Sequence, residues 1–409
     1  MFLRMGKNAC RFLTDCKGPE QYSADAPDER RNMRTLFGFQ PALLLVFAVG
    51  AGSIGTVHAS PASLADTVRP VVVEQMQRMR IPGLIVSVQT PDGQSWIEAL
   101  GIADTVTQTP MNVADHMRVG SITKSFTATV ILQLAQDGRL ALDDQLATYF
   151  PGFDTNNATI RQALQLTSGV ADYTTVGFLN ALAEAPQRVW SPGELLATVA
   201  DQPPMFPAGT SWYYSNTNYV MLGMLAEQVT GQPLGRLIAD RVFAPLQMTG
   251  CSMPAISDAD LPEPFSRGYQ FGTDWGRTTA PPAPLPPLLD VTDTNPSWAA
   301  GAGAAICTVA DMTIWANALA TGQLLDPSMQ AQRLSWYPTQ DPKAKYGLGV
   351  VDINGLVGHN GEISGYMSQA ARRESDGALI VVLTNLTSAP DNGEPATVIS
   401  EMISRAVPG

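Results

Sequence analysis

The chain has 409 residues, of which 45% are hydrophobic, and its formal net charge is −12. This composition suffices for a large hydrophobic core and excludes an intrinsically disordered protein. The acidic balance, without any run of basic residues after the N-terminal region, also excludes a typical nucleic-acid-binding protein.

Residues 1–59 are typical of an N-terminal extension with a secretory signal peptide. An apolar stretch at 36–51 follows several arginines and precedes Val57-His58-Ala59, a small-x-small cleavage pattern. The stretch is too short and too interrupted for a spanning helix. We therefore expect an exported protein, periplasmic or secreted, without a stable membrane anchor, whose true start is Met33. Without the 7 basic and 5 acidic residues of this extension the net charge is about −14.

Two cysteines, Cys251 and Cys307, and two histidines, His116 and His359, follow the signal peptide. In an exported protein the cysteines can form one disulfide bond, but two thiols that never meet fit the sequence equally well. No cysteine or histidine pair has the spacing of metal ligands. We therefore expect no metal and no cofactor, and we interpret His116 as structural.

The predicted elements begin with a helix over about 63–79. Two strand-like runs, 84–90 and 95–101, flank the turn sequence Pro91-Asp92-Gly93 and predict a hairpin. The next segment, 126–135, is apolar on nearly all sides and predicts a buried helix.

The middle of the chain, from about 143 to 254, consists of helical segments separated by glycine and proline. Residues 272–296 are rich in proline, which we interpret as an extended loop, with a polyproline partner motif as the alternative. The chain then returns to strand character and ends in a helix, with segments at 347–352, 356–359, 366–373, 378–383 and 394–405.

Strands near both ends and helices between them predict an α/β (α+β) fold with an inserted helical part. We expect an α/β domain formed by residues 60–142 and 296–409. A mainly α domain, with the proline-rich loop, comprises residues 143–295.

Ser121 and Lys124 form a Ser-x-x-Lys pair at the start of the buried helix. Three residues are about one helical turn, so the lysine amine returns to the face of the serine hydroxyl. A desolvated amine can take the serine proton and make the oxygen a nucleophile. Taken alone, such a pair is more often an accident on a solvated helix. The scarcity of lysine and the absence of acids between Arg118 and Phe126 favour the catalytic interpretation.

Tyr214 and Asn216 are two residues apart in an extended turn and project to the same side. A phenol can exchange protons, and we expect a neighbouring ammonium to lower its pKa, while the amide can orient a substrate. For this pair alone, an aromatic cluster at a domain seam with Asn216 as a helix cap is the favoured alternative. A helix is expected over about 219–229.

His359 lies between glycines in Gly358-His359-Asn360-Gly361. Glycines beside a strand residue allow close approach of another backbone, and an edge strand can bind an extended substrate. His359 can supply a proton or a positive charge there, although a lone histidine is more often structural.

These motifs, in this order, resemble those of serine β-lactamases and penicillin-binding proteins. The variant with Tyr and His is similar to class C β-lactamases and, more closely, to secreted D-alanyl-D-alanine carboxypeptidases and related esterases. The resemblance covers nearly the whole mature chain, including Phe206-Pro207-Ala208-Gly209, 297–301 and Tyr346-Gly347-Leu348-Gly349. It implies a β-lactamase/transpeptidase-like two-domain fold, with an antiparallel sheet flanked by helices.

The resemblance also implies roles for the site residues. Ser121 would be the acylated nucleophile and Lys124 its proton acceptor or activator, while Tyr214 would move protons in acylation and deacylation. The substrate would contact Asn216, Gly361 and Glu362, and His359 would stand where class C enzymes have lysine. The backbone N–H groups of Ser121 and Glu362 would form the oxyanion hole.

The function implied is an exported serine hydrolase acting through an acyl-enzyme, a D-alanyl-D-alanine carboxypeptidase on peptidoglycan peptides. The alternatives are a β-lactamase or small-ester esterase and, from another class, a penicillin- or peptidoglycan-binding protein with negligible turnover. We expect a monomer that binds a small molecule or peptide and no nucleic acid.

Two departures leave the acyl donor open. Carboxypeptidases carry an arginine where this chain has Val350-Val351-Asp352, and Glu362 stands where Thr or Ser often binds a carboxylate. Arg372 or Arg373, on the next strand, is a candidate to compensate.

Overall fold

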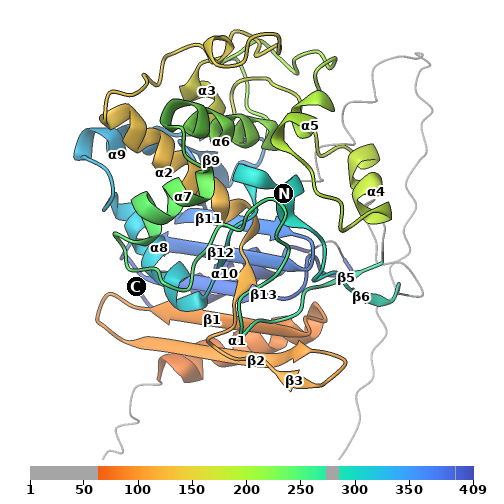
Figure 1. Ribbon diagram of the computed structural model, residues 1–409. Coiled ribbons are helices and arrows are strands. Elements are labelled where there is room, and N and C mark those ends of the chain that lie inside the picture. The colour runs from red at the N-terminus through yellow and green to blue at the C-terminus, as the bar shows by residue number, and fades with distance from the viewer. Residues whose placement is uncertain (1–62, 273–284, 392) are drawn as a thin grey trace, which may run out of the picture. The chain divides into compact units, whose positions relative to one another are not determined.

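The computed structural model describes residues 63–272, 285–391 and 393–409. A nine-stranded antiparallel sheet in the order β3-β2-β1-β13-β12-β11-β10-β9-β8 forms the centre of this part of the chain (Figure 1). Its strands are β1 (Gly83–Gln89), β2 (Ser95–Asp104), β3 (Thr109–Pro110), β8 (Tyr337–Pro338), β9 (Ala344–Tyr346), β10 (Val351–Ile353), β11 (Leu356–Ile363), β12 (Tyr366–Arg373) and β13 (Leu379–Thr384). Two further pairs are β4 (Met117–Arg118) with β7 (Ile306–Cys307), and β5 (Tyr269–Phe271) with β6 (Leu288–Asp290).

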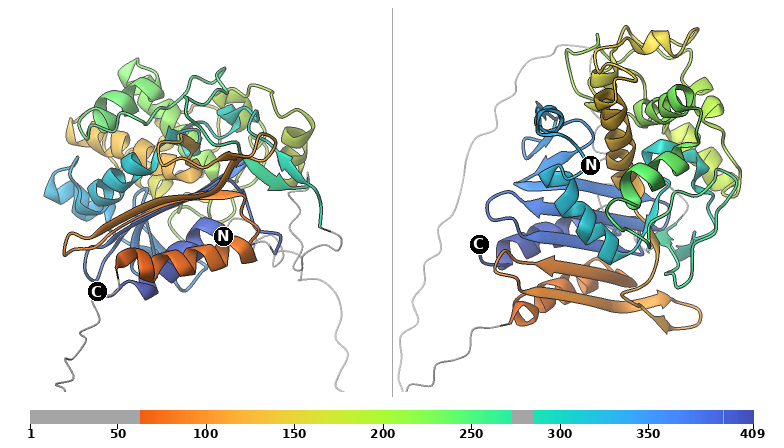
Figure 2. Two further views of the ribbon diagram at one scale, coloured as in Figure 1. Left: turned by 90° about the horizontal axis from the view of Figure 1, so that it is seen from below. Right: turned by 60° about the vertical axis from the view of Figure 1, so that its left-hand side comes forward.

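Helices cover both faces of the large sheet, as Figures 1 and 2 show. The helices are α1 (Leu64–Arg78), α2 (Thr123–Gln136), α3 (Ile160–Leu164), α4 (Val176–Glu184), α5 (Pro192–Ala197), α6 (Asn216–Thr230), α7 (Leu234–Ile238), α8 (Val309–Thr321), α9 (Pro327–Arg333) and α10 (Pro395–Ala406). Helices α1 and α10 share one hydrophobic core with the sheet, in which Val68, Val86 and Ile399 are fully buried. Helix α8 packs on the other face, against β12 and β13.

This architecture confirms the predicted fold class, an antiparallel sheet flanked by helices. The sheet joins the two ends of the chain, because β1 pairs with β13 from Leu84↔Thr384 to Gln89↔Leu379. The first helix begins at a capping box in which the Ser63 hydroxyl accepts the N–H of Asp66.

The predicted strand over 347–352 is correct only for 351–352, which belong to β10, and is wrong for 347–350. Gly349 has a φ of +72°, and a Cβ on Gly347 would lie 2.2 Å from the carbonyl oxygen of Arg333. Residues 347–350 therefore form a tight turn between β9 and β10. Its positive φ at Gly349 is a conformation that glycine adopts without strain. The predicted strand at 356–359 is correct but too short, since β11 continues to Ile363.

The signal peptide and residues 273–284 of the predicted proline-rich loop lie outside the described residues. Contacts between Cα atoms group the chain from Ala62 to Gly409 as one compact unit, and the division at residues 142 and 295 stays a prediction. Among the described helices, none has the length and hydrophobicity needed to cross a bilayer.

Cys251 and Cys307 form a disulfide bond that closes a segment of 56 residues. Cys307 is buried in β7 and pairs with Met117 of β4, four residues before Ser121. The bond therefore ties the end of the helical region to β7, the partner of the strand that leads into the Ser-x-x-Lys pair.

Replacing both cysteines by alanine is expected to lower the free energy of unfolding by about 4 kcal/mol, because closing a loop of this length restricts the unfolded chain. Urea unfolding of the variant and the oxidised protein measures the difference. An unchanged free energy of unfolding would contradict a stabilising role for the bond.

Candidate active site

Ser121 lies in a short 3-10 helix, η2 (Gly120–Ile122), that leads directly into α2, and only 4% of its surface is exposed. This turn packs against β11. Gly120 has a φ of +52°, and a Cβ there would lie 2.6 Å from the backbone nitrogen of Glu362. Glycine is therefore required before the serine, both for its conformation and for the close approach of β11.

Lys124 is fully buried one turn after Ser121, as its spacing predicts. Its Nζ lies 3.0 Å from Ser121 Oγ, 2.7 Å from Asn216 Oδ1 and 2.8 Å from the carbonyl oxygen of Ala302. Burial lowers the pKa of Lys124 well below its usual value, although the nearby carboxylate of Asp172 opposes the shift. A neutral amine donates its two protons to the two carbonyl acceptors and directs its lone pair at Ser121 Oγ.

Asn216 is the first residue of α6 and touches both Lys124 and the segment before α4. Its backbone N–H donates to Asp172 Oδ1 at 2.9 Å, and its Nδ2 donates to Thr174 Oγ1 at 3.2 Å. Thr174 in turn donates to Asp172. Asp172 and Thr174 thus fix the amide that faces Lys124. The sequence suggests that 172–178 helps to shape the substrate pocket, but only the fold shows that Asp172 and Thr174 contact the start of α6.

Tyr214 is half-buried beside the pair, with Lys124 Nζ 4.8 Å from the centre of its ring. The predicted lowering of its pKa is wrong for the free protein. Burial raises the pKa of Tyr214 well above its usual value, and a hydrogen bond with Ser121 offsets this only in part. The physical reason is that the phenol is itself desolvated, which disfavours the charged phenolate. The alternative aromatic cluster is also present, since Trp212 and Tyr346 pack around Tyr214.

His359 is 1% exposed and faces Tyr346 rather than solvent. Its Nε2 lies 2.9 Å from the Tyr346 hydroxyl and its Nδ1 lies 2.6 Å from the carbonyl oxygen of Asn360. Burial lowers the pKa of His359 to about 3. The expectation that His359 supplies a proton or a positive charge is therefore wrong for the free protein, because the ring is neutral at ordinary pH.

Gly361 and Glu362 bring β11 against the serine. A Cβ on Gly361 would lie 2.9 Å from the backbone nitrogen of Ser121 and 2.0 Å from the carbonyl oxygen of Val119. The backbone nitrogens of Ser121 and Glu362 therefore converge, as an oxyanion hole requires.

The two candidate compensating arginines lie at the other end of β11. Arg372 pairs with Val357, and Arg373 pairs with Leu356. Arg373 is bound to Asp376 and to the carbonyl oxygen of Val407. Neither arginine occupies the position from which a carboxylate at Ser121 could be held.

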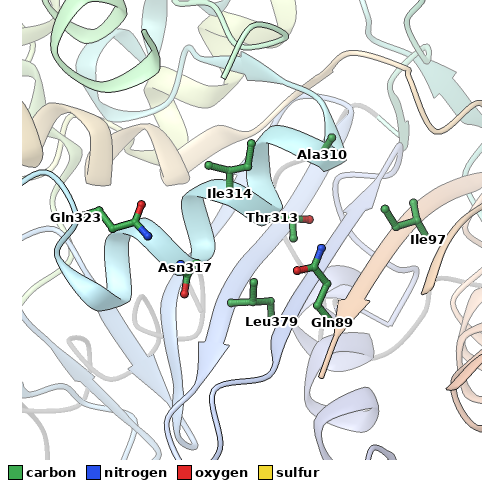
Figure 3. Close-up of a pocket in the computed structure, with 8 residues that line it drawn as sticks. All are labelled: Gln89, Ile97, Ala310, Thr313, Ile314, Asn317, Gln323 and Leu379. Carbon is green, nitrogen blue, oxygen red and sulfur yellow. The ribbon is translucent and has the colours of Figure 1, made fainter. Parts of the chain in front are cut away.

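A separate pocket of about 420 Å³ lies between α8 and the strands β1, β2 and β13 (Figure 3). It contains none of the site residues and has no charged or nucleophilic side chain. Its lining residues are Gln89, Ile97, Ala310, Thr313, Ile314, Asn317, Gln323 and Leu379.

Comparison with known proteins agrees with this geometry. The Beta-lactamase family profile matches residues 68–401. The D-aminopeptidase of Brucella anthropi is 30% identical over 303 residues, which cover 72% of this chain and 54% of the relative. The chain thus spans about half the length of the curated relatives it matches.

Two solved structures are similar over most of the chain. The D-stereospecific amidohydrolase from Streptomyces sp. is 30% identical, with a TM-score of 0.70 and coverage of 82% of this chain and 97% of that one. The D-amino acid amidase from Ochrobactrum anthropi SV3, complexed with D-phenylalanine, is 25% identical, with a TM-score of 0.73 and coverage of 84% and 98%.

Removing the buried carboxylate is expected to shift the pH dependence of ester hydrolysis. Asp172 raises the pKa of Lys124, so Asp172→Asn lowers that pKa further. Because the deprotonated amine is the active form, the rise of kcat/KM with pH should occur at lower pH in the variant. The profile with p-nitrophenyl butyrate measures it, Asp143→Asn serves as an exposed control, and a shift to higher pH would contradict the assignment.

Gly361→Ala is expected to reduce kcat by roughly 100-fold or more, since displacing one oxyanion donor has a cost of this size. The added Cβ would meet the Val119 carbonyl oxygen at 2.0 Å and push β11 away from Ser121. Gly355→Ala is the matched control, because a Cβ there meets nothing within 4 Å, although its positive φ carries its own strain. Full activity of Gly361→Ala, measured with the same ester, would refute this assignment of the oxyanion hole.

Proposed function

Because the chain belongs to the Beta-lactamase family of serine hydrolases, we propose that it is an acyl-enzyme amidohydrolase acting on amides of D-amino acids that carry a free α-amino group. Ser121 is its nucleophile, and the curated and solved relatives named above support the substrate class. The observation that carries the proposal is the carboxylate of Asp172, which is linked to Ser121 through Asn216 and Lys124.

Acylation starts with the neutral Lys124. Its amine takes the Ser121 proton while Oγ attacks the amide carbonyl, and the developing oxyanion is held by the N–H groups of Ser121 and Glu362. Asn216 and the carbonyl of Ala302 keep the amine in place throughout this step.

Tyr214 serves as the proton donor to the leaving amine. Its raised pKa keeps it protonated in the free enzyme, and the new ammonium of Lys124 favours the phenolate once the proton has left. The proton on Lys124 then returns to the tyrosine, which restores both groups. In deacylation a water molecule attacks the ester carbonyl, and the same two groups carry its proton to Ser121 Oγ as the ester bond breaks.

The charges near Ser121 favour a substrate with an ammonium group. Asp172 is half-buried and is held beside Asn216. Burial raises its pKa, so this carboxylate gains from a cationic partner more than a solvated one does. Glu362, whose backbone borders Gly120, adds a second acid.

The D-alanyl-D-alanine carboxypeptidase is the second candidate, favoured by the resemblance of the motifs to that family. Its substrate ends in a carboxylate, which Asp172 and Glu362 would repel. Export to the periplasm or outside is part of the proposal, supported by the disulfide bond and by the N-terminal sequence. The monomeric state stays a prediction.

A substrate panel tests the proposal. We expect D-alanine p-nitroanilide to be hydrolysed at least about tenfold faster, in kcat/KM, than its N-acetyl derivative, as a charged hydrogen bond of ordinary strength implies. L-alanine p-nitroanilide, diacetyl-L-Lys-D-Ala-D-Ala and nitrocefin complete the panel. Release of D-alanine from the diacetyl peptide, without amide hydrolysis of D-alanine p-nitroanilide, would establish the carboxypeptidase instead.

Two variants test which residues act as the nucleophile and as the partner of the substrate amine. Ser121→Ala should lose all turnover and all labelling by a fluorophosphonate. Asp172→Asn should reduce the preference for the free amine while retaining hydrolysis of p-nitrophenyl butyrate at the alkaline plateau, and Asp143→Asn should change neither. An unaltered amine preference in Asp172→Asn would assign the recognition to another group.

A further inference from the structure

The second half of β11 has a strand neighbour on one side only. Residues 356–358 pair with β10, whereas 359–363 pair with β12 alone. A two-residue turn joins β11 to β12, and alternate residues of such a hairpin exchange ladder hydrogen bonds, beginning with the pair next to the turn. By this alternation the backbone groups of Asn360 and Glu362 face the open edge, on the side of Ser121.

The His359 ring occupies part of this open edge. Its Nδ1 lies 2.6 Å from the carbonyl oxygen of Asn360. A carbonyl oxygen can only accept, so the ring proton is on Nδ1. In the neutral ring Nε2 is then an acceptor, and the hydroxyl of Tyr346 donates to it at 2.9 Å.

Tyr346 is itself held rigidly. It ends β9, where it pairs with Val351, and it is 1% exposed. Its ring centre lies 5.8 Å from that of Trp212 and 6.4 Å from that of Tyr214. The hydroxyl is therefore fixed from β9, which is separated from β11 by β10 in the same sheet.

We propose that Tyr346 is a positioning residue that fixes His359 as the Nδ1–H tautomer. In this form the imidazole donates a hydrogen bond to the Asn360 carbonyl oxygen and holds this backbone in place, two residues before the oxyanion donor of Glu362. This hydrogen bond from the His359 ring takes the place of the backbone hydrogen bond that a second neighbouring strand would make to Asn360. His359 thus supports the backbone as a neutral side chain, whereas the lysine that class C enzymes have at this position would be a cation. The inference rests on acyl-enzyme chemistry at Ser121 and is independent of the preference for an amine.

The tautomer is measured first in the unaltered protein. The sequence contains 3 histidines, and a long-range ¹H–¹⁵N spectrum distinguishes Nδ1–H from Nε2–H in each. His359→Gln identifies the signal. We expect His359 to be protonated on Nδ1 alone, and an Nε2–H ring or an imidazolium at pH 7 would overturn the proposal without any Tyr346 variant.

Tyr346→Phe then tests the link to catalysis. We expect kcat for p-nitrophenyl butyrate to fall about tenfold or more, with KM within about twofold. The effect is smaller than the loss of an oxyanion donor, because the Glu362 N–H is shifted and not removed. The His359 signal should leave the Nδ1–H form. Wild-type kcat, or an unchanged His359 spectrum, would refute the positioning role.

Tyr269→Phe is the matched control. Tyr269 is equally buried, and its hydroxyl accepts the N–H of Thr105 at 2.8 Å, away from His359. It should retain the wild-type kcat and His359 spectrum. The ester lacks an amino group, so these results stand even if the D-amino-acid substrates of the proposed function are not turned over.

Discussion

The burial of one lysine amine is the constraint on which the rest of the site depends. A charge on Lys124 is disfavoured because the side chain is fully buried, and the carboxylate of Asp172 opposes this effect. Burial alone would only make the amine neutral. The carbonyl oxygens of Asn216 and Ala302 also hold its two protons, so that the remaining lone pair is directed at Ser121 Oγ.

The position of the proposed oxyanion donors depends on backbone packing and not on side chains. The oxyanion donors belong to a helix start and a strand that meet only because Gly120 and Gly361 have no Cβ. Side chains at these positions would collide with backbone atoms, which cannot rotate away. The geometry that stabilises the oxyanion is thus a property of two glycines, while the side chains control where protons go.

Much of this arrangement could be predicted from the sequence, because the relevant signals are local. Ser121 and Lys124 are one helical turn apart. Ser63 marks the start of the first helix, and the turn that contains Gly93 marks the hairpin of β1 and β2. Asp172 and Tyr346 carry no such signal. Asp172 contacts Asn216, which is 44 residues away in the sequence, and Tyr346 contacts His359, which is 13 residues away. Only the assembled sheet and helices create these contacts.

The expected lowering of the Tyr214 pKa illustrates the same limit in electrostatic terms. Sequence reasoning placed an ammonium beside the phenol, and the distance of 4.8 Å from Nζ to the ring centre agrees. Burial, however, lowers the pKa of Lys124 and raises that of Tyr214, so the phenol keeps its proton in the free enzyme. The ammonium forms only when Ser121 has transferred its proton, and it then lowers the Tyr214 pKa at the moment when a leaving group needs that proton. The same two residues can thus serve as base and then as acid, because burial keeps both neutral until the serine reacts.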